Sequence, residues 1–344
     1  MAKVLVGLSG GVDSAVVAAL LKQQGHEVYG YTLKLLETLD SDEGEGCCTF
    51  KDIRDARMVC DQMGIEYLVT NWKQQFKEKV IDRYLDGAKQ GIAYNPCVTC
   101  NSTIKLPVLA AVANHFGCEY IATGHYARVN NGRISRAKNL KKDQSYFLWE
   151  TPSDVVSRLI FPLGDFDSKE DTRALAREFG LHVAEKKDST DLCFLGGGTK
   201  EEFLERNNVV SSGGNFVDVD GKVVGKHEGY TKYVAGQRAN IAGSNNARYV
   251  LNVVHSTGNV VVGSREQASS RSFFLTNARI DFKVGVDTVT AVTRYHSSPV
   301  TVEAITSSDS GVNVSLRESV FGVAKGQSCV FYCGDEVVGG GVIS

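Results

Sequence analysis

Apolar and polar positions follow two different rhythms along the chain, and the change falls near residue 215. Before it, short apolar runs alternate with longer helical patterns, each of which stops at a glycine. Glycine favours helix ends because it takes the left-handed cap conformation at little cost. Beyond residue 215, short runs rich in Val and Thr are separated by turn pairs such as Asp-Gly. The first part is therefore expected to be α/β, and the rest all-β.

The first part is predicted to form a doubly wound parallel sheet. Strands are expected at 3–8, 27–33, 66–72 and 118–125, and helices at 14–25, 48–64, 104–117 and 171–180. This alternation is typical of a parallel sheet with helices on both faces. The β part is expected to hold two small units with a seam at 266–272. The predicted domains are a catalytic domain over 1–198, a small central β-rich domain over 199–266 and a C-terminal β-barrel over 267–344.

Composition agrees with an ordinary globular protein. The 344 residues are 42% apolar and 23% charged, and no run of 18 apolar residues predicts a membrane span. The start, MAKVLVGLSGG, lacks the features of a signal peptide, so a cytoplasmic location is expected. There, cysteines are more often catalytic, metal-bound or buried than disulfide-bonded. The odd count of nine cysteines also argues against a full disulfide framework.

Charge is unevenly distributed although the formal net charge is only −2. The segment 37–45 holds five acids and no base. A second segment holds six bases and no acid: Arg128, Arg133, Arg136, Lys138, Lys141 and Lys142. On residues alone, a solvated loop and an anion-binding surface are equally good interpretations of the basic segment.

A glycine-rich turn, GLSGGVDS at 7–14, follows the first predicted strand and opens the first helix. Parallel sheets present ligand sites at this place, and a helix N-terminus attracts anions. Gly10 and Gly11 let the backbone approach a phosphate, whereas Asp13 fits an anion site only with Mg²⁺ between carboxylate and phosphate. No Lys follows the glycines, so the turn is not a Walker loop. A phosphate site and a plain capped turn remain equally open.

The letters SGGVDS resemble the phosphate loop of the ATP pyrophosphatase superfamily. That resemblance implies that the loop holds ATP while an acceptor oxygen attacks the α-phosphorus. Pyrophosphate then leaves and the acceptor is adenylated.

Further blocks narrow the resemblance. They are NPCVTCN at 95–101, ATGHYAR at 122–128, KDQSYFL at 142–148, DSTDLCF at 188–194, GYTKYVAGQR at 229–238, TRYH at 293–296 and GQSCVFYCGDEVVGGGVI at 326–343. In this order they resemble the tRNA-specific 2-thiouridylase family. The resemblance implies a cytoplasmic, monomeric enzyme that uses ATP and Mg²⁺ to replace O2 of the wobble uridine by sulfur. It also implies tRNAs for Lys, Glu and Gln as substrates. A sulfur-transfer protein or cysteine desulfurase would supply the sulfur as a persulfide.

Matching positions give the expected site residues. The ATP loop would be formed by Gly7, Leu8, Ser9, Gly10, Gly11, Val12, Asp13 and Ser14, with Leu33 packing against adenine and Gly124 lining the pocket. Cys193 matches the cysteine that carries the persulfide, and Cys100 matches the cysteine beside the base. The tRNA-contacting positions would be Asn95, Pro96, Cys97, Lys142, Asp143, Gln144, Arg294 and Tyr295. The resemblance also implies a function for the basic segment, because its positive charges would attract tRNA phosphates.

Cys97 departs from the family pattern, which often has aspartate there, and it forms a C-x-x-C pair with Cys100. Three interpretations stay open. In the first, Cys97 is a tolerated replacement of the aspartate, and Cys100 and Cys193 carry out two-cysteine persulfide chemistry. In the second, Cys97, Cys100 and Cys193 hold a [4Fe–4S] cluster. In the third, Cys97 and Cys100 form half of a zinc site. The zinc alternative needs two more ligands, and no second C-x-x-C motif exists.

The other cysteines carry less chemistry. Cys60 and Cys118 are expected to be buried hydrophobes, Cys329 and Cys333 structural, and Cys47 and Cys48 exposed. A role for His125 as a polar group near the nucleotide and a structural role are both open. Two other functions compete with thiolation: an amidating ATP pyrophosphatase, which needs no thiols, and a non-catalytic RNA-binding protein with a vestigial loop.

Overall fold

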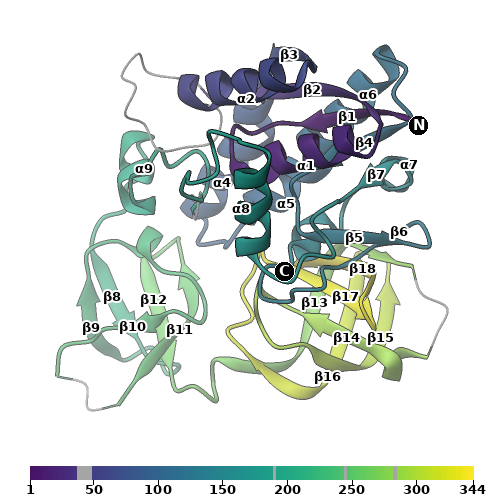
Figure 1. Ribbon diagram of the computed structural model, residues 1–344. Coiled ribbons are helices and arrows are strands. Elements are labelled where there is room, and N and C mark those ends of the chain that lie inside the picture. Colours follow the sequence, from purple (N-terminus) through teal and green to yellow (C-terminus); the bar gives the residue numbers. More distant parts are fainter. Residues whose placement is uncertain (37–48, 189–190, 244–245, 282–284) are drawn as a thin grey trace. The chain divides into compact units, whose positions relative to one another are not determined.

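The computed structural model describes residues 1–36, 49–188, 191–243, 246–281 and 285–344 (Figure 1). These residues group into two compact units. The first contains Met1–Ile81, Cys97–Gly198 and Asp335–Val337, and the second contains Asp82–Pro96, Thr199–Gly334 and Val338–Ser344. The chain therefore passes between the units more than once, and each unit is built from distant stretches of sequence.

A parallel sheet forms the centre of the first unit. Its strands are β1 (Lys3–Gly7), β2 (Glu27–Lys34), β3 (Glu66–Asn71), β4 (Tyr120–Thr123) and β7 (Leu159–Ile160), in the order β3-β2-β1-β4-β7. Every pairing is parallel. The four strands predicted for this sheet are thus confirmed. Strand order reverses between β1 and β4, and such a switch point is where open α/β sheets bind ligands.

Helices α1 (Val12–Gln23), α2 (Phe50–Met63) and α8 (Lys169–Glu178) lie close to the predicted places. Thr49 and Ser168 cap α2 and α8 through reciprocal bonds with Asp52 and Asp171. Such capping boxes satisfy backbone donors at the first turn and so fix where each helix begins. Gly64 ends α2 in the left-handed conformation, as the sequence predicted.

The helix predicted at 104–117 begins earlier, at Pro96. It runs through α5 (Pro96–Cys100), a π turn (Asn101–Lys105) and α6 (Leu106–His115). Pro96 suits a first helical position because its missing N–H has no partner there in any helix. Both cysteines of the C-x-x-C pair therefore lie on a helix. The run Pro96–His115 is long and apolar enough to cross a membrane by composition, but 61% of that window is buried within the protein.

Several short elements of the first unit were not predicted. α3 (Lys73–Phe76) and a π turn (Lys77–Ile81) follow β3. The basic segment forms a hairpin, β5 (Ala127–Asn130) and β6 (Arg133–Arg136), with Asn131 and Gly132 at positive φ in its turn. A 3-10 turn (Ser145–Leu148) and α7 (Ser153–Val156) come next. These pieces are too short for a periodic pattern to reveal them.

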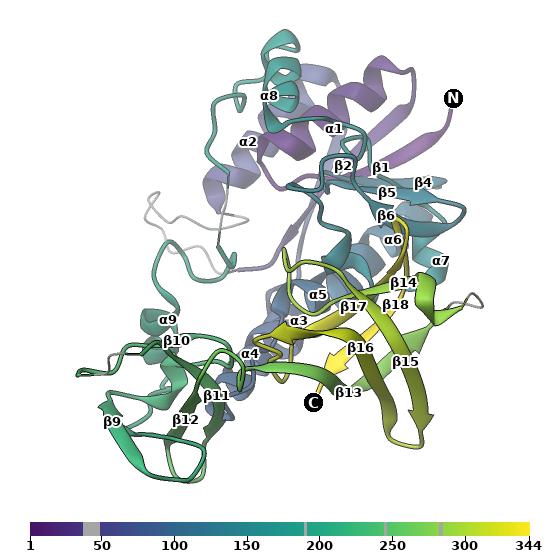
Figure 2. The ribbon, with the colours of Figure 1, turned by 90° about the horizontal axis from the view of Figure 1, so that it is seen from below.

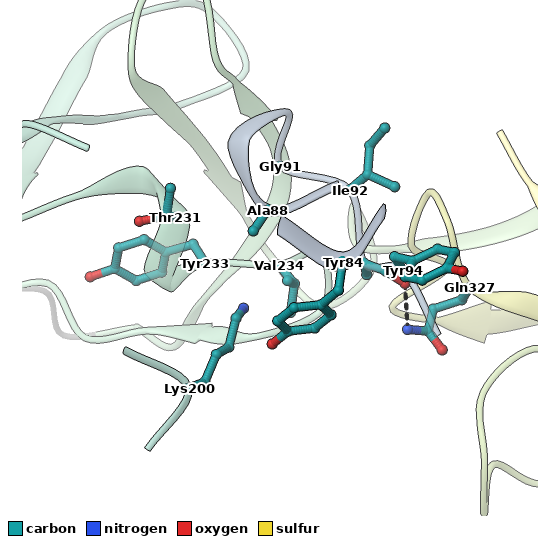
Figure 3. Close-up of a pocket in the computed structure, with 11 residues that line it drawn as sticks. Tyr84, Ala88, Gly91, Ile92, Tyr94, Lys200, Thr231, Tyr233, Val234 and Gln327 are labelled. Atoms are coloured by element: carbon teal, nitrogen blue, oxygen red, sulfur yellow. Dashed lines mark hydrogen bonds between the residues drawn. The ribbon is translucent and has the colours of Figure 1, made fainter. Parts of the chain in front are cut away.

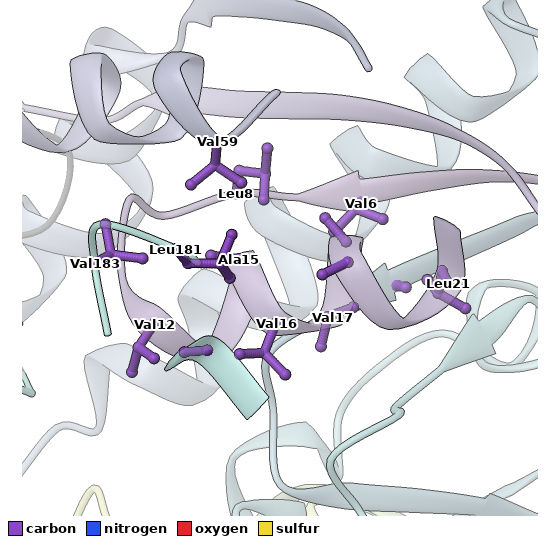
Figure 4. Packing of buried hydrophobic residues seen from close by; sticks show 14 of the residues in the cluster. Val6, Leu8, Val12, Ala15, Val16, Val17, Leu21, Val59, Leu181 and Val183 are labelled. Carbon is purple, nitrogen blue, oxygen red and sulfur yellow. The ribbon is translucent and has the colours of Figure 1, made fainter. Parts of the chain in front are cut away.

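The core of the first unit explains the position of the loop after β1. Val4, Val6 and Leu8 alternate along the strand and face one layer of buried side chains. Ala15 and Val16 of α1 belong to the same layer, and Figure 4 shows α1 lying against the sheet through these residues. Complete burial of such side chains stabilises the fold by roughly 1.5–3 kcal/mol each. The strand end and the helix start are thereby held on either side of residues 8–11.

The second unit begins with α4 (Asp82–Lys89) and continues with α9 (Lys200–Arg206). A small sheet follows, with β8 (Gly214–Val217), β9 (Val223–His227), β10 (Arg238–Ala239), β11 (Arg248–Val254) and β12 (Asn259–Gly263). Its strand order is β10-β11-β12-β8-β9, and β12 pairs with β8 in parallel. A 3-10 turn (Tyr230–Lys232) lies between β9 and β10. Phe216, Val250 and Val260 form the centre of its core.

The C-terminal strands of the second unit form a closed barrel (Figure 2). They are β13 (Ser269–Ile280), β14 (Val289–Val292), β15 (Val300–Ser308), β16 (Gly311–Phe321), β17 (Ser328–Cys333) and β18 (Glu336–Ile343), with a 3-10 turn (Val286–Thr288) before β14. Pairing of β13 with both β16 and β18 closes the barrel. The predicted seam overlaps the start of β13, because Ser269 already pairs with Phe321. The exact domain boundaries stay a prediction.

Candidate active site

The loop after β1 is tied to β2 before it turns into α1. Leu8 N–H donates to the Tyr31 carbonyl over 2.8 Å, and Thr32 Oγ1 donates to the Leu8 carbonyl over 2.7 Å. Gly10 has a φ of +73°, and a Cβ there would lie 2.2 Å from the Asp52 carbonyl oxygen. Any other residue at position 10 would combine an unfavourable backbone conformation with a backbone clash.

Hydroxyl groups hold the inside of this loop. Ser14 Oγ accepts from Ser9 N–H at 3.1 Å and donates to the Gly11 carbonyl at 3.2 Å. Gly11 is the N-cap of α1 and has extended backbone, while Val12 is buried in the core. The free N–H groups at the start of this helix favour an anion.

Two further strands bring expected residues to the same edge of the sheet. Gly124 directly follows β4, and a Cβ there would lie 2.9 Å from Ser14 N and 2.9 Å from Asp13 Cβ. Leu33 lies near the carboxyl end of β2 and is buried. The structure therefore gathers the expected nucleotide residues at the carboxyl ends of β1, β2 and β4, beside the switch point.

Asp13 has a partner that the sequence did not reveal. Its carboxylate accepts from Lys169 Nζ at 2.6 Å and from the Tyr126 hydroxyl at 3.1 Å. Lys169 also pairs with Asp188 at 3.0 Å, and Arg173 pairs with that same carboxylate at 3.1 Å. Burial, and secondarily the Asp13 charge, raise the pKa of Tyr126, so its hydroxyl stays a proton donor. An ammonium group from α8 thus stands beside the phosphate loop, although no lysine follows the glycines.

Lys186 supports the loop from outside. Its ammonium donates to the Gly10 carbonyl over 2.8 Å and pairs with Asp52 and Asp55 at 2.7 and 2.5 Å. Burial lowers the pKa of Lys186, but the hydrogen bonds and charges of the two carboxylates outweigh it and raise the pKa overall. The lysine is therefore a permanent cation that fixes the loop to α2. In the sequence, the only signal for this role of Lys186 is its position two residues before the DSTDLCF block.

His125 lies on the segment after β4, directly behind Gly124. Its Nδ1 shares a 2.7 Å hydrogen bond with Thr123 Oγ1, and its ring packs edge-on against Phe161. Burial, assisted by the positive charge of Lys105, lowers the pKa of His125 to about 3. The imidazole is therefore neutral at physiological pH, which fits a polar group better than a charged ligand for phosphate.

The cysteines differ in their surroundings. Cys100 is buried on α5, whereas Cys97 and Cys193 are partly exposed, and all three belong to the first unit. Cys60 and Cys118 are buried, as expected, and Cys329 is buried as well; burial raises the pKa of each of these thiols. Cys47 and Cys48 lie outside the described residues. Buried thiols of raised pKa are poor nucleophiles, so Cys60, Cys118 and Cys329 fit structural roles.

The structure does not assemble the three thiols as a metal site. Within the described ranges, no group of three or more His, Cys, Asp or Glu side chains is arranged to hold a metal ion. Cys97, Cys100 and Cys193 are all described, so the donor set required for a [4Fe–4S] cluster is not assembled in this conformation. Among the residues that the structure describes, no further ligands join Cys97 and Cys100 as the zinc alternative requires.

The expected tRNA positions after the basic hairpin have unequal exposure. Lys142 is exposed, but the Asp143 carboxylate is buried and accepts from Ala137 N, Ser145 N and Ser145 Oγ at 2.8, 3.2 and 2.7 Å. Burial raises the pKa of Asp143 although these hydrogen bonds oppose it. Gln144 accepts from Tyr126 N–H at 2.9 Å through its side chain. The Asp143 carboxylate and the Gln144 side-chain oxygen thus hold the fold around Lys142.

Acidic neighbours also reduce the charge of the basic segment. Arg128 pairs with Asp335 at 3.1 Å, and Lys138 pairs with Asp167 at 3.0 Å. Lys141 and Lys142 remain as exposed cations at its end. An anion that approaches this end of the segment would therefore meet two exposed ammonium groups.

The remaining expected positions belong to the second unit. Asn95 is partly exposed and Pro96 is buried at the start of α5. Arg294 is exposed after β14, and the Tyr295 ring stacks on His296 at 3.8 Å between centroids. His296 has a φ of +61°, so the turn that carries these residues has a defined shape.

Comparison with known proteins now identifies the family. Three family models match: the tRNA methyl transferase HUP domain over 2–197, the tRNA methyl transferase PRC-barrel domain over 201–264 and the aminomethyltransferase beta-barrel domain over 275–343. The tRNA-specific 2-thiouridylases MnmA of Clostridium acetobutylicum and Aquifex aeolicus are each 38% identical to this chain. The alignments cover 99% of this chain and 99% and 98% of those proteins. The chain belongs to the tRNA-specific 2-thiouridylase family.

Membership in the 2-thiouridylase family confirms the resemblance predicted from the motifs, and the matched models confirm the predicted fold class. Likeness to solved structures is weaker. A 4-thiouridine synthetase–RNA complex with bound ATP has a TM-score of 0.37 and 17% identity, and covers 60% of this chain and 50% of that one. NMN synthetase from Francisella tularensis has a TM-score of 0.36 and 18% identity, and covers 60% and 76%. Scores of this size carry no inference about function.

Proposed function

We propose that this chain is an ATP-dependent tRNA-uridine 2-sulfurtransferase that makes 2-thiouridine at the wobble position. The observation that carries the proposal is the glycine-lined edge of the sheet, where Gly10 and Gly124 leave no room for a side chain. Its setting in a chain that matches 2-thiouridylases over nearly its whole length supports the same activity. The family match favours this function over an amidating synthetase and over a vestigial RNA-binding protein.

In the first step, O2 of the uridine attacks the α-phosphorus of ATP. A bond forms between O2 and phosphorus, the bond from the α-phosphorus to the bridging oxygen breaks, and pyrophosphate leaves. The N–H groups at the start of α1 and the Lys169 ammonium would bind the triphosphate. Mg²⁺, held by Asp13, would neutralise phosphate charge when bound. Lys169, which pairs with Asp13 in this structure, would then be released towards the phosphates.

In the second step, sulfur replaces the adenylated oxygen. The terminal sulfur of a persulfide on Cys193 attacks C2 of the base, and AMP leaves with the original oxygen. Cys100 then attacks the inner sulfur of Cys193, the sulfur–sulfur bond breaks, and its electron pair stays on the sulfur of the base. An external thiol reductant reopens the disulfide of Cys100 and Cys193. Both cysteines lie in the first unit, which supports a reaction between them.

Recognition of the base needs it to leave its stack. Proteins read single-stranded RNA by splaying bases into pockets, and chemistry at C2 requires the same movement. Asn95, Pro96 and Cys97 would face the target base, while Lys142 and Arg294 would bind tRNA phosphates. We further propose a cytoplasmic monomer that acts on tRNAs for Lys, Glu and Gln and receives persulfide sulfur from a partner protein.

One reaction tests this function. The protein is incubated with ATP, Mg²⁺, a persulfide source and unmodified tRNA, and both 2-thiouridine and pyrophosphate are measured. The proposal expects both products, each dependent on tRNA. Pyrophosphate without thiolated tRNA would favour an amidating synthetase, and absence of both products would favour a binding protein.

A further inference from the structure

A cavity of about 190 Å³ lies within the second unit (Figure 3). Its lining comes from α4 and the segment behind it, from the start of α9, from the 3-10 turn after β9 and from the turn before β17. The side chains that matter are Tyr84, Tyr94, Lys200, Thr231, Tyr233 and Gln327. None of the roles proposed above uses this cavity.

Hydrogen bonds fix its walls. Gln327 Nε2 donates to the Ala93 carbonyl over 2.7 Å, and Ala93 N–H donates to the Lys325 carbonyl over 2.7 Å. The Tyr230 hydroxyl donates to the Lys89 carbonyl over 2.9 Å. A Cβ on Gly326 would lie 2.3 Å from Ile92 Cγ2, so the two segments touch directly. The cavity is therefore preformed, as ligand sites usually are.

Lys200 gives the cavity an unusual charge. No Asp or Glu lines it, and no carboxylate of the described residues forms an ion pair with the Lys200 ammonium. In Figure 3 the lysine side chain points between the rings of Tyr84 and Tyr233. Burial lowers the pKa of Lys200, and the nearby charge of Glu201 opposes this only in part. A partly buried cation without an acid is best satisfied by an anion brought from outside.

The volume and the lining residues of the cavity limit which kind of molecule can carry this anion. The volume lies below the roughly 300–1,000 Å³ of pockets that enclose a whole small-molecule ligand. The lining offers flat aromatic rings, a hydroxyl group on Thr231 and an amide on Gln327. Rings that stack a single base, beside a cation for its phosphate, are the usual means of binding single-stranded nucleic acid.

The cavity also gives a role to sequence blocks that had none. Thr231 and Tyr233 come from GYTKYVAGQR, and Gln327 comes from the last block of the chain. Tyr94 directly precedes Asn95, which is proposed to face the target uridine. Since consecutive Cα atoms are about 3.8 Å apart, a ligand against Tyr94 lies close to that segment.

We propose that this cavity binds one unstacked nucleotide of the tRNA close to the target uridine, with its base against the tyrosines and its phosphate on Lys200. The inference rests on the proposed function, because it assumes that the chain binds tRNA. A free mononucleotide has the same base and phosphate, and the experiment separates the two sources.

Protection of Lys200 from acetylation is the first test. Wild-type protein is treated with limiting acetic anhydride alone, with unmodified tRNA, or with 5′-AMP or 5′-UMP, and labelled peptides are measured by mass spectrometry. Lys226, an exposed lysine of the same small sheet, serves as the internal reference. We expect tRNA to protect Lys200 relative to Lys226, and the mononucleotides to leave it reactive. No protection by tRNA, or protection by mononucleotides alone, overturns the proposal.

The second test is kinetic. Lys200→Met should raise the KM for tRNA about tenfold, since a hydrogen bond to a charged group is lost. The KM for ATP and kcat at saturating tRNA should stay within about twofold, and Lys226→Met should leave all three unchanged. An unaltered KM for tRNA in a folded Lys200→Met protein overturns the proposal. If that variant does not fold, the protection of the wild-type lysine decides alone.

These tests separate the inference from the function on which it rests. Protection needs neither ATP nor sulfur, so it is measured even if no turnover occurs. A wild-type protein that thiolates tRNA without protecting Lys200 contradicts only the cavity. A protein that protects Lys200 without making pyrophosphate or 2-thiouridine contradicts only the proposed reaction.

Discussion

Lys186 donates a 2.8 Å hydrogen bond to the carbonyl oxygen of Gly10, although 176 positions separate the two residues. The same ammonium pairs with Asp52 and Asp55, whose side chains are only 12% and 9% exposed. One side chain therefore holds the loop conformation and pairs with two buried carboxylates, of which Asp55 also lies 3.4 Å from His182 Nε2.

Lys186→Met is expected to destabilise the first unit and weaken ATP binding together. Removing one partner of a buried ion pair leaves an uncompensated charge, which costs about 3–5 kcal/mol. The chain's two tryptophans, Trp72 and Trp149, both lie in the first unit, so tryptophan fluorescence reports its unfolding in urea. The exposed neighbour Lys187 provides the control, and Lys187→Met should leave stability and the KM for ATP unchanged. Equal stability of the two variants would contradict the proposed role of Lys186 in holding the loop and the two carboxylates in place.

The two loop glycines should respond differently to alanine. At Gly10 a methyl group meets the Asp52 carbonyl at 2.2 Å with φ at +73°, whereas at Gly11 the nearest atom, Ser9 Oγ, is 3.5 Å away. Gly10→Ala should lower the free energy of unfolding by roughly 2–4 kcal/mol and abolish pyrophosphate release. Gly11→Ala should fold normally and keep the KM for ATP within about threefold, because its N–H group is retained. A Gly10→Ala protein that is as active as Gly11→Ala would show that the loop adapts.

Cys97→Asp distinguishes the two routes for sulfur. If Cys97 is a tolerated variant, the aspartate often found at this position should preserve thiolation. If it is a cluster ligand, replacing one of three thiolates should abolish activity and iron binding. Because the three thiols are not assembled as a metal site, we expect activity within about threefold of wild type. Iron content and absorbance near 400 nm of anaerobically purified protein give the independent measurement.

Cys193→Ser and Cys100→Ser should separate activation from sulfur transfer. Both variants keep the phosphate loop, so tRNA-dependent pyrophosphate release is expected to persist while 2-thiouridine is lost. Cys333→Ser, a partly buried thiol of the second unit, is the matched control and should retain full activity. Loss of pyrophosphate release in Cys193→Ser alone would instead place that cysteine in the adenylation step.

His125 predicts a specific loss of stability in acid. Its pKa is about 3 in the folded protein and near 6.5 in an unfolded chain. Between these pH values the unfolded chain binds a proton that the folded chain does not, so the free energy of unfolding falls as pH drops below 6.5. The slope contributed by this group is at most about 1.4 kcal/mol per pH unit. His125→Gln should remove it, which urea titrations at pH 7 and pH 5 would measure. Parallel pH dependence in both proteins would assign the acid sensitivity to other groups.

Local patterns predicted the parts of the site that depend on local chain geometry. The loop 7–14 could be placed because a strand, two glycines and a helix start follow one another directly. Gly124, which directly follows β4, was assigned from the family resemblance and not from a local pattern. The roles of Lys169 and Lys186 could not be predicted from local patterns, because their contacts to Asp13 and Gly10 are set by the packing of segments that are distant in the sequence. Periodicity locates an element but does not say which of its charged residues faces a neighbour.

Asp143 shows the opposite difficulty. The resemblance gave it a tRNA contact, yet its carboxylate is buried and accepts hydrogen bonds from Ala137 and Ser145. The spacing of Asp143 and Ser145 is the one that lets an Asp side chain bond the backbone two residues on, so the local sequence contained a signal for this role. The helix start at Pro96 was missed because the π turn at 101–105 interrupts the α-helical period that marks α6.

The π turn that follows Cys100 has its origin in chain length. A π turn contains one residue more than the α-helical turn it replaces. Because the extra residue is taken up within one widened turn, deleting a residue between 101 and 105 would restore a continuous α-helix and leave the direction of α5 relative to α6 nearly unchanged. Cys100 would keep its direction, but the widened turn next to it would be lost. The backbone shape beside this thiol is thus encoded in the number of residues, a feature that comparison of residue identities alone does not register.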